Sequence, residues 1–227
     1  MKRILIPVLC LITAVLASAF QTISETRTLD AFKRIRIEGP LHVKVVSGKA
    51  YSIVIETEDE PTSRIRTSVD RDKLSVQLQH GRFQGRAKVL ITCPDLSGLE
   101  LSGTATVSFP EERVGRYLEV KATGAASADL RLRMEEVRVA AETSSDIRIE
   151  GTVGSLIADC ATASGLDAFS LQADRVDVRV RTAGQARVSV KSELKAEAST
   201  AGVVKYRGDP VRSNTQSTTA GVIRRID

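Results

Sequence analysis

The chain has 227 residues, of which 42% are hydrophobic and 4% aromatic, and it carries a formal net charge of +5. A chain of this length is able to bury a substantial core. The weak positive charge and the scarcity of aromatic side chains argue against nucleic-acid binding, which relies on strong basic patches with stacking residues. We therefore expect no nucleic-acid partner.

The first 19 residues have the three parts of a secretory signal peptide. Lys2 and Arg3 supply the charged start, residues 4–16 are apolar, and a small-residue cleavage site ends at Ala19. The apolar run is too short for a comfortable membrane span. We therefore expect an exported protein that has no membrane span after cleavage and lies in the periplasm, on the outer surface or outside the cell. Loss of the two basic residues lowers the formal charge from +5 to +3.

After the signal peptide, residues 32–94 read as short strands separated by turns. Apolar residues alternate within each segment, as in half-buried strands. The predicted strands are residues 34–38, 41–46, 51–56, 64–69, 73–78 and 88–92. Ile35 and Ile53 lie 18 positions apart, and Ile53 and Leu74 lie 21 apart, so these strands are interpreted as early, irregular coils. No linker separates them from the rest, which predicts one domain over residues 20–227.

From Leu99 to Ile226 the sequence repeats itself about every twenty residues. Each repeat is anchored by a Gly or Thr that is followed by small residues. The anchors are Gly103, Gly124, Thr143, Thr162, Thr182, Thr200 and Thr219, spaced 21, 19, 19, 20, 18 and 19 positions apart. A fixed period of this length is typical of a solenoid, and a Thr-Ala-Gly phrase is typical of a corner.

Alignment on the anchors places the apolar residues in columns. Inward pairs precede and follow each anchor with a period of two, which predicts a strand on either side of the corner. One such column is Leu99, Val120, Val139, Ala158, Val178 and Ala196. A looser third segment closes each coil. We therefore predict an all-β fold, a single-stranded right-handed parallel β-helix with coils of 18–21 residues; a leucine-rich-repeat horseshoe would need a helix or an asparagine/leucine consensus that the repeats lack.

Two outward columns carry charges that alternate in sign. Five positions past the anchor they are Asp129, Arg148, Asp167, Arg187, Lys205 and Arg224; three positions before it they are Glu100, Lys121, Ala140, Asp159, Arg179, Glu197 and Gln216. One interpretation is a ladder of ion pairs that fixes register, each exposed pair contributing about 0–1 kcal/mol. The other interpretation is a surface that binds a charged polymer along the helix.

Positive charge gathers at the C-terminal end of the first column. The candidate ligand-binding residues are Arg187, Lys205, Arg207 and Arg224, with Arg212 and Arg225 nearby. If the protein binds an anionic glycan or a lipid headgroup by charge, we expect it to do so there. In the last coil Thr215, Ser217 and Arg225 replace apolar inward residues, which is interpreted as a C-terminal cap that favours a discrete particle over a fibre.

Enzymatic chemistry is the alternative to binding, because many β-helices act on polysaccharides. A glycosidase needs two carboxyl groups in one cleft with different pKa values. Asp159 and Asp177 lie 18 positions apart, but their columns alternate with Arg and Lys, which would hold them ionised. His42 and His80 have no spaced Cys or His partners. We therefore expect no catalytic residues, no metal site and no cofactor.

Two cysteines follow the signal peptide, Cys93 and Cys160. An exported protein is able to form a disulfide, but the repeat places these residues about three coils apart. That separation exceeds the roughly 7 Å between Cα atoms that a disulfide allows. We predict two buried thiols.

One segment resembles a known family. In "LDAFKRIRIEGPLHVKVVSGKAYSIVIETED" the matching positions are Phe32, Ile35, Gly39, Gly48, Tyr51, Ile53, Ile55 and Glu56. Together with "KLSVQL", "ITCPDLSGLELSGTATV" and the Thr-Ala-Gly repeats they resemble the bacterial head domain called GIN, labelled "putative autotransporter adhesin", over about residues 28–226. The resemblance implies an exported right-handed β-helix and brings no catalytic residues.

These observations lead to one functional hypothesis and one alternative. The hypothesis is an exported, non-catalytic surface or periplasmic module for binding or adhesion, which recognises an envelope or extracellular polysaccharide or a surface protein along a β-helix face. The alternative is a β-helix lyase or glycosidase that acts on a polysaccharide. The oligomeric state is open.

Overall fold

The computed structural model describes residues 22–58, 60–79 and 87–226. The predicted signal peptide and His80 lie outside these ranges. Within them the chain forms one sheet of seventeen strands and a single 3₁₀ turn, η1 (Thr62–Arg64). The strands are β1 (Thr22–Thr28), β2 (Arg34–Glu38), β3 (His42–Ser47), β4 (Ser52–Glu58), β5 (Ile65–Asp70), β6 (Lys73–Leu78), β7 (Ala87–Cys93), β8 (Gly98–Ser102), β9 (Thr106–Ser108), β10 (Arg113–Ala122), β11 (Ser127–Ala141), β12 (Asp146–Cys160), β13 (Gly165–Val180), β14 (Gln185–Ala198), β15 (Val203–Arg207), β16 (Arg212–Ser217) and β17 (Val222–Arg225).

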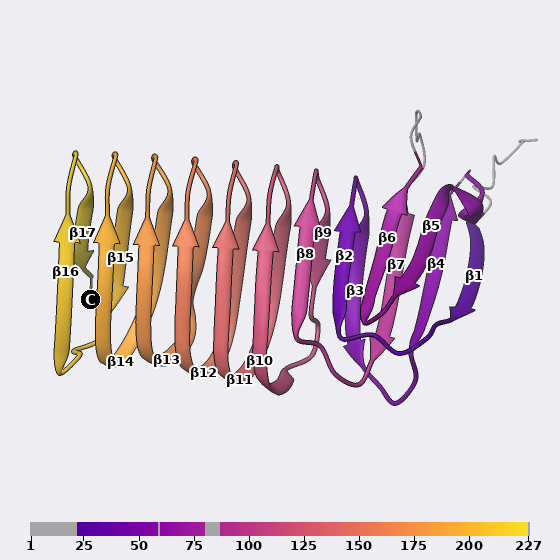
Figure 1. Cartoon of the computed structure of the whole chain (residues 1–227), viewed down its shortest axis with the longest axis horizontal. Coiled ribbons are helices and arrows are strands. Elements are labelled where there is room, and N and C mark those ends of the chain that lie inside the picture. The colour runs from indigo at the N-terminus through magenta and orange to yellow at the C-terminus, as the bar shows by residue number, and fades with distance from the viewer. Residues whose placement is uncertain (1–21, 59, 80–86, 227) are drawn as a thin grey trace, which may run out of the picture.

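Strands β8 to β17 wind into a right-handed parallel β-helix whose coils stack side by side (Figure 1). The register predicted from the repeat is confirmed: Val120 pairs with Leu99 on one side and with Val139 on the other, and Val178 pairs with Ala158 and Ala196. All six of these side chains are buried. Each coil therefore places its apolar columns over those of its neighbours, and the core is one continuous stack.

Each coil has one tight corner, and the corners line up along one edge of the molecule (Figure 1). In the Thr182 corner, Thr182 and Ala183 have φ values of 51° and 59°, and the Gly184 N–H closes the turn onto the Arg181 carbonyl at 3.0 Å. A Cβ at Gly184 would lie 2.9 Å from the carbonyl oxygen of Cys160 in the preceding coil, which explains the glycine. The left-handed pair costs about 1–2 kcal/mol per residue, and hydrogen bonds to the next corner, such as Ala183 N–H to Thr200 O at 2.9 Å, offset it.

The far side of the coil differs from the predicted third segment. Strands β11 to β14 run without interruption from one corner to the next, with lengths of 14–16 residues. The turn is instead absorbed by register shifts, one of which lies between Arg148 and Gly151. Gly151 has a φ of 116°, and a Cβ there would overlap the carbonyl oxygen of Leu132. The curve is therefore a set of bulges within long strands.

The predicted buried thiols are confirmed. Cys93 and Cys160 are free, and both are completely buried. Burial raises the pKa of both thiols, and that of Cys160 rises to about 12. The Arg113 guanidinium lies 3.1 Å from the Cys93 sulfur and donates to the Cys93 carbonyl at 2.9 Å, yet desolvation still dominates the pKa of that thiol. Neither sulfur is a reactive nucleophile.

The N-terminal strands lie where the alternation places them, but they do not stack as successive coils. Strand β2 sits between β6 and β8, with Ile35 opposite both Leu74 and Leu99. Ile53 on β4 faces Ile91 on β7 in an antiparallel pair, so it does not continue the column of Ile35. Consecutive spacing misleads here because the chain folds back on itself.

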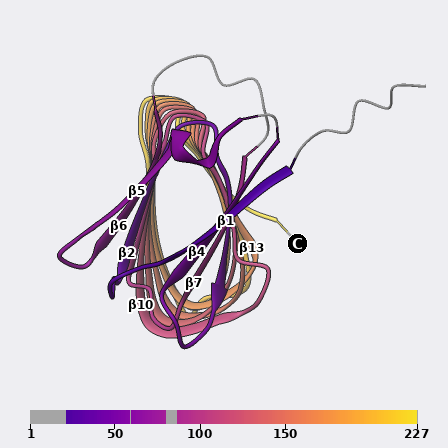
Figure 2. The ribbon, with the colours of Figure 1, turned by 90° about the vertical axis from the view of Figure 1, so that its right-hand side faces the viewer.

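The first strand, β1, was not predicted, because its residues are mostly polar and exposed. It pairs antiparallel with β4 and closes the N-terminal end of one face. Strand β5 pairs antiparallel with β6 and closes the other face. Figure 2 views the molecule from this end: the coils superpose as a flattened ring and the N-terminal strands cross in front of it.

Candidate functional site

The basic residues singled out from the sequence do come together. Arg187 on β14, Lys205 on β15 and Arg224 on β17 are direct register partners in three successive coils. Arg207 follows Lys205 by two residues and therefore points to the same face. Neighbouring strands lie about 4.8 Å apart. We call these four residues the basic cluster.

An aromatic ring organises part of the basic cluster. The guanidinium groups of Arg187 and Arg207 lie 4.3 and 4.4 Å from the centroid of Phe169. Such cation–π contacts contribute about 0.5–1 kcal/mol at exposed sites and orient the guanidinium planes. Phe169 is half-buried on β13. It was not predicted because it lies in the bulged part of the repeat, where the columns lose their spacing.

The charges of the cluster are unevenly compensated. Arg187 forms an ion pair with Asp167 at 3.0 Å. Within the described part of the chain, Lys205, Arg207 and Arg224 have no acidic partner within 4.0 Å. Arg225 is held by Asp209 at 2.9 Å and Arg212 by Glu193 at 3.9 Å, so those two neighbours are compensated. The net positive charge is therefore concentrated on three side chains.

The charge columns stack as predicted, but they form only part of a ladder. In the second column Arg179 pairs with Glu197 across coils at 3.3 Å. In the first column Asp129, Arg148 and Asp167 are register neighbours, yet over the described residues the ion pair within 4.0 Å is the one between Asp167 and Arg187. Over the described residues each column thus has one ion pair between successive coils, so ion-pair laddering accounts for only part of either face.

The carboxylates considered for catalysis are engaged by basic side chains. Asp159 accepts two hydrogen bonds from Arg181 at 2.9 and 3.0 Å, and Asp177 lies 3.4 Å from the Lys195 ammonium. Both line a recess of about 250 Å³ together with Arg138 and Arg179. Each acid is thus compensated where it lies, whereas a glycosidase pair needs one carboxyl held protonated.

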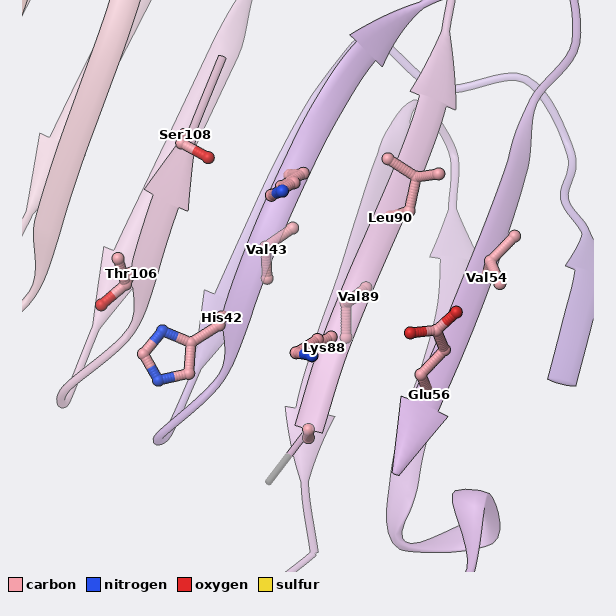
Figure 3. Close-up of a pocket in the computed structure, with 11 residues that line it drawn as sticks. His42, Val43, Val54, Glu56, Lys88, Val89, Leu90, Thr106 and Ser108 are labelled. Carbon is pink, nitrogen blue, oxygen red and sulfur yellow. The ribbon is translucent and has the colours of Figure 1, made fainter. Parts of the chain in front are cut away.

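The sequence patterns did not predict a groove of about 750 Å³ on strands β9, β3, β7 and β4. Figure 3 shows its side chains: His42, Lys88 and Glu56 along one row, with Leu90 and Val54 beside them. The available signal was the pair of unbroken apolar runs Ile53–Ile55 and Val89–Ile91. Their middle residues, Val54 and Leu90, face outward, where alternation calls for polar side chains.

Metal and membrane sites are not evident in the parts of the chain that the structure describes. Those residues contain no group of three or more His, Cys, Asp or Glu side chains placed to hold a metal ion. His42 lies on the groove, among polar and basic neighbours. Over the same residues, no helix has the length and apolar character needed to cross a membrane.

The fold and surface define a class: a parallel β-helix with a capped N-terminal end and charged, rigid faces. Residues 31–210 match the family model described as "Putative auto-transporter adhesin, head GIN domain", and the chain belongs to this family. The resemblance noted in the sequence is therefore confirmed, and the family's description indicates an exported or surface protein.

Solved structures with the same fold come from Bacteroides and Parabacteroides species. A "putative adhesin" from Bacteroides fragilis superposes with a TM-score of 0.81 at 18% identity, over 91% of this chain and 97% of that one. A "putative lipid binding protein" from Parabacteroides distasonis has a TM-score of 0.75 at 15% identity, with the same coverage. A "putative adhesin" from Parabacteroides merdae has a TM-score of 0.73 at 15% identity, again over 91% and 97%. No curated protein matches the chain.

Proposed function

We propose that this protein is an exported, non-catalytic binding module that recognises an anionic envelope glycan through the basic cluster. The observation that carries the proposal is the register of Arg187, Lys205 and Arg224 on one face of three successive coils. Membership of an adhesin-type family and the adhesin descriptions of two structural neighbours support a binding role.

The geometry of the cluster suits a polymer with repeated acidic groups. Two like charges 4 Å apart repel by about 1 kcal/mol in water, so stacked cations at about the strand spacing are destabilised until an anion lies along them. The backbone that carries them is a hydrogen-bonded sheet, so little conformational entropy is lost on binding. Phe169 fixes two of the guanidinium groups in advance.

The test is binding of the purified protein to an array of envelope and extracellular glycans at two salt concentrations. We expect binding to acidic glycans that weakens at high salt, because screening shortens the reach of exposed charges. The double variant Lys205→Gln/Arg224→Gln should lower affinity at least tenfold. The control is Lys44→Gln/Lys88→Gln, which removes two exposed lysines elsewhere on the same face.

Two results would overturn the proposal. One is the absence of binding to any acidic glycan, which would direct attention to protein partners in the envelope. The other is binding that the double variant leaves unchanged. Vesicles containing an anionic phospholipid serve as a parallel arm, because a phosphate headgroup offers the cluster the same charge; preference for vesicles over every glycan would reassign the ligand.

A further inference from the structure

The groove on β9, β3, β7 and β4 is separate from the basic cluster and has a different composition. Its outward rows follow from the strand register. One row runs Ser108, Lys44, Leu90 and Val54, and the other runs Thr106, His42, Lys88 and Glu56. Figure 3 labels Ser108, Leu90 and Val54 of the first row and all four members of the second. The groove therefore has an apolar part on β7 and β4 and a basic part on β3 and β7.

The apolar part is exposed where a soluble sheet normally carries polar side chains. Leu90 is 37% exposed, and Val54 beside it is half-buried. The two are direct cross-strand partners, so their side chains form one continuous apolar strip. Single exposed apolar residues need no explanation, but a strip that forms the floor of a groove marks a contact surface.

The basic part flanks one end of this strip. Lys44 is the register partner of Leu90, and Lys88 lies two residues before Leu90 on the same strand. Within the described residues neither lysine has an acidic side chain within 4.0 Å. His42 is the cross-strand neighbour of Lys88, and the one acid of the groove, Glu56, lies on the other side of Lys88, on β4. The groove is therefore positively charged at β3 and β7, where Lys44 and Lys88 lie, and negatively charged at β4, where Glu56 lies.

The size and lining of the groove narrow the class of ligand. Its volume of about 750 Å³ falls within the range of small-molecule sites, about 300–1,000 Å³. Its eleven lining residues include no Phe, Tyr or Trp, so it offers no flat ring for a sugar to stack on. Aliphatic side chains on one part and two lysines on the other match a molecule with an alkyl chain and an anionic head.

We propose that this groove binds a single-chain aliphatic anion, with the head between Lys44 and Lys88 and the chain over Leu90 and Val54. Glu56 beyond Lys88 repels a head placed at the β4 end, and so sets the direction of the ligand. Thr106 and Ser108 supply hydroxyl groups on the β9 side of the head. This site does not depend on the proposed glycan site, which lies on the C-terminal coils.

The experiment is titration of the purified protein with sodium octanoate, decanoate and dodecanoate below their micelle concentrations, measured by calorimetry. We expect one saturable site whose affinity rises by up to about fourfold for each added methylene, the equivalent of about 0.8 kcal/mol per buried CH₂. Decanol, which has the chain without the charge, should bind at least tenfold more weakly than decanoate.

Matched variants separate the two halves of the site. Leu90→Ser should lower the affinity for dodecanoate about tenfold and flatten the dependence on chain length. Lys44→Gln should weaken carboxylate binding and leave decanol unchanged. The controls are Val222→Ser and Lys205→Gln on the C-terminal coils; Val222 is 45% exposed, similar to Leu90. Neither control should alter dodecanoate binding.

Independent readouts keep the proposal falsifiable if a groove variant fails to fold. A dodecanoate carrying a nitroxide should broaden the amide resonances of β3, β7 and β4 in the unmodified protein and leave those of β14 and β15 sharp. The proposal is overturned by no saturable binding, by affinity independent of chain length, or by binding that Leu90→Ser leaves intact. A dimer that dissociates in Leu90→Ser would also overturn it, since the strip would then be a contact with a second copy.

Discussion

The two ends of this molecule are built from similar strands by different rules. From β8 to β17 each strand pairs with the strand one repeat later, so partners lie 17–21 residues apart; Val178 and Ala196 are 18 apart. In the N-terminal region β2 pairs with β8, which places Arg34 opposite Gly98. There β4 pairs antiparallel with β7, and β5 pairs antiparallel with β6. The coils are thus held by contacts between residues that are close in the sequence, whereas the N-terminal region brings together residues that are far apart in the sequence.

This difference shows how a solenoid is terminated. A coil exposes an unpaired edge unless something covers it. At the N-terminal end antiparallel strands β1 and β5 provide the cover, and building them costs loop-closure entropy. In the last described coil β16 is fully exposed, and polar residues Thr215 and Ser217 take the positions of apolar ones. That these residues cap the helix stays a prediction.

The largest expected effect tests the inward register of the coils. Val178→Asp places a carboxylate in a completely buried position with no basic partner in the column, so we expect a loss of more than about 4 kcal/mol in the free energy of unfolding. Urea unfolding followed by circular dichroism measures it.

The matched control is Arg179→Ala, one residue further along the same strand. Arg179 points outward and pairs with Glu197 at 3.3 Å, so its removal should cost about 1 kcal/mol or less. An unchanged thermal midpoint in Val178→Asp would mean that the register is wrong.

The second prediction concerns the bulges that replace the expected third segment. Gly151→Ala combines a φ of 116° with overlap between the new Cβ and the Leu132 carbonyl oxygen, so we expect a loss of about 2–3 kcal/mol. Gly115→Ala is the control, because its Cβ would meet only the flexible end of Met134. Equal midpoints for the two variants in thermal unfolding would show that the bulge is not strained by a side chain.

Sequence reasoning succeeded where contacts repeat and failed where they do not. The partners of Val120 and Val178 were predicted correctly because, in a periodic sequence, residues one period apart pair in neighbouring coils. The partner of Ile53 could not be found in the same way, because antiparallel pairing with Ile91 reverses the direction of the chain. The basic cluster was found as a column. The groove was missed because the outward positions of Val54 and Leu90 become neighbours only after β4 and β7 pair.

The third prediction uses the buried thiol of Cys160, whose pKa rises from the ordinary 9.0 to about 12. The unfolded chain ionises this thiol above pH 9 while the folded protein keeps it neutral, so the stabilising effect is complete below pH 9 and is lost as pH rises toward 12. At pH 10 the loss is on the order of 1 kcal/mol. Urea unfolding at pH 8 and pH 10 measures it, and Cys160→Ala should lose less stability over this interval.

The smallest expected effect concerns the strand that closes the N-terminal end. Arg27 on β1 holds Glu25 through hydrogen bonds of 2.8 Å and donates to the Ile65 carbonyl at 2.8 Å and to Thr67 at 2.9 Å. Hydrogen bonding from Arg27 is the main cause that lowers the pKa of Glu25 from 4.5 to about 2, followed by Thr62. Both side chains are partly exposed, so the stabilisation is about 1 kcal/mol or less after solvent screening.

The sign of this effect is opposite to that of Cys160, because the pKa of Glu25 is lowered. The contribution is present above pH 4.5 and is lost as pH falls toward 2. Arg27→Ala should therefore speed amide hydrogen exchange in β1 while leaving exchange in β12 and β13 unchanged, since β1 pairs with β4 and Arg27 donates to β5, both in the N-terminal region. In the unmodified protein the same local opening should appear on acidification from pH 5 to pH 3. Equal acceleration in β1 and β13 would instead mean that cap and coils unfold as one unit.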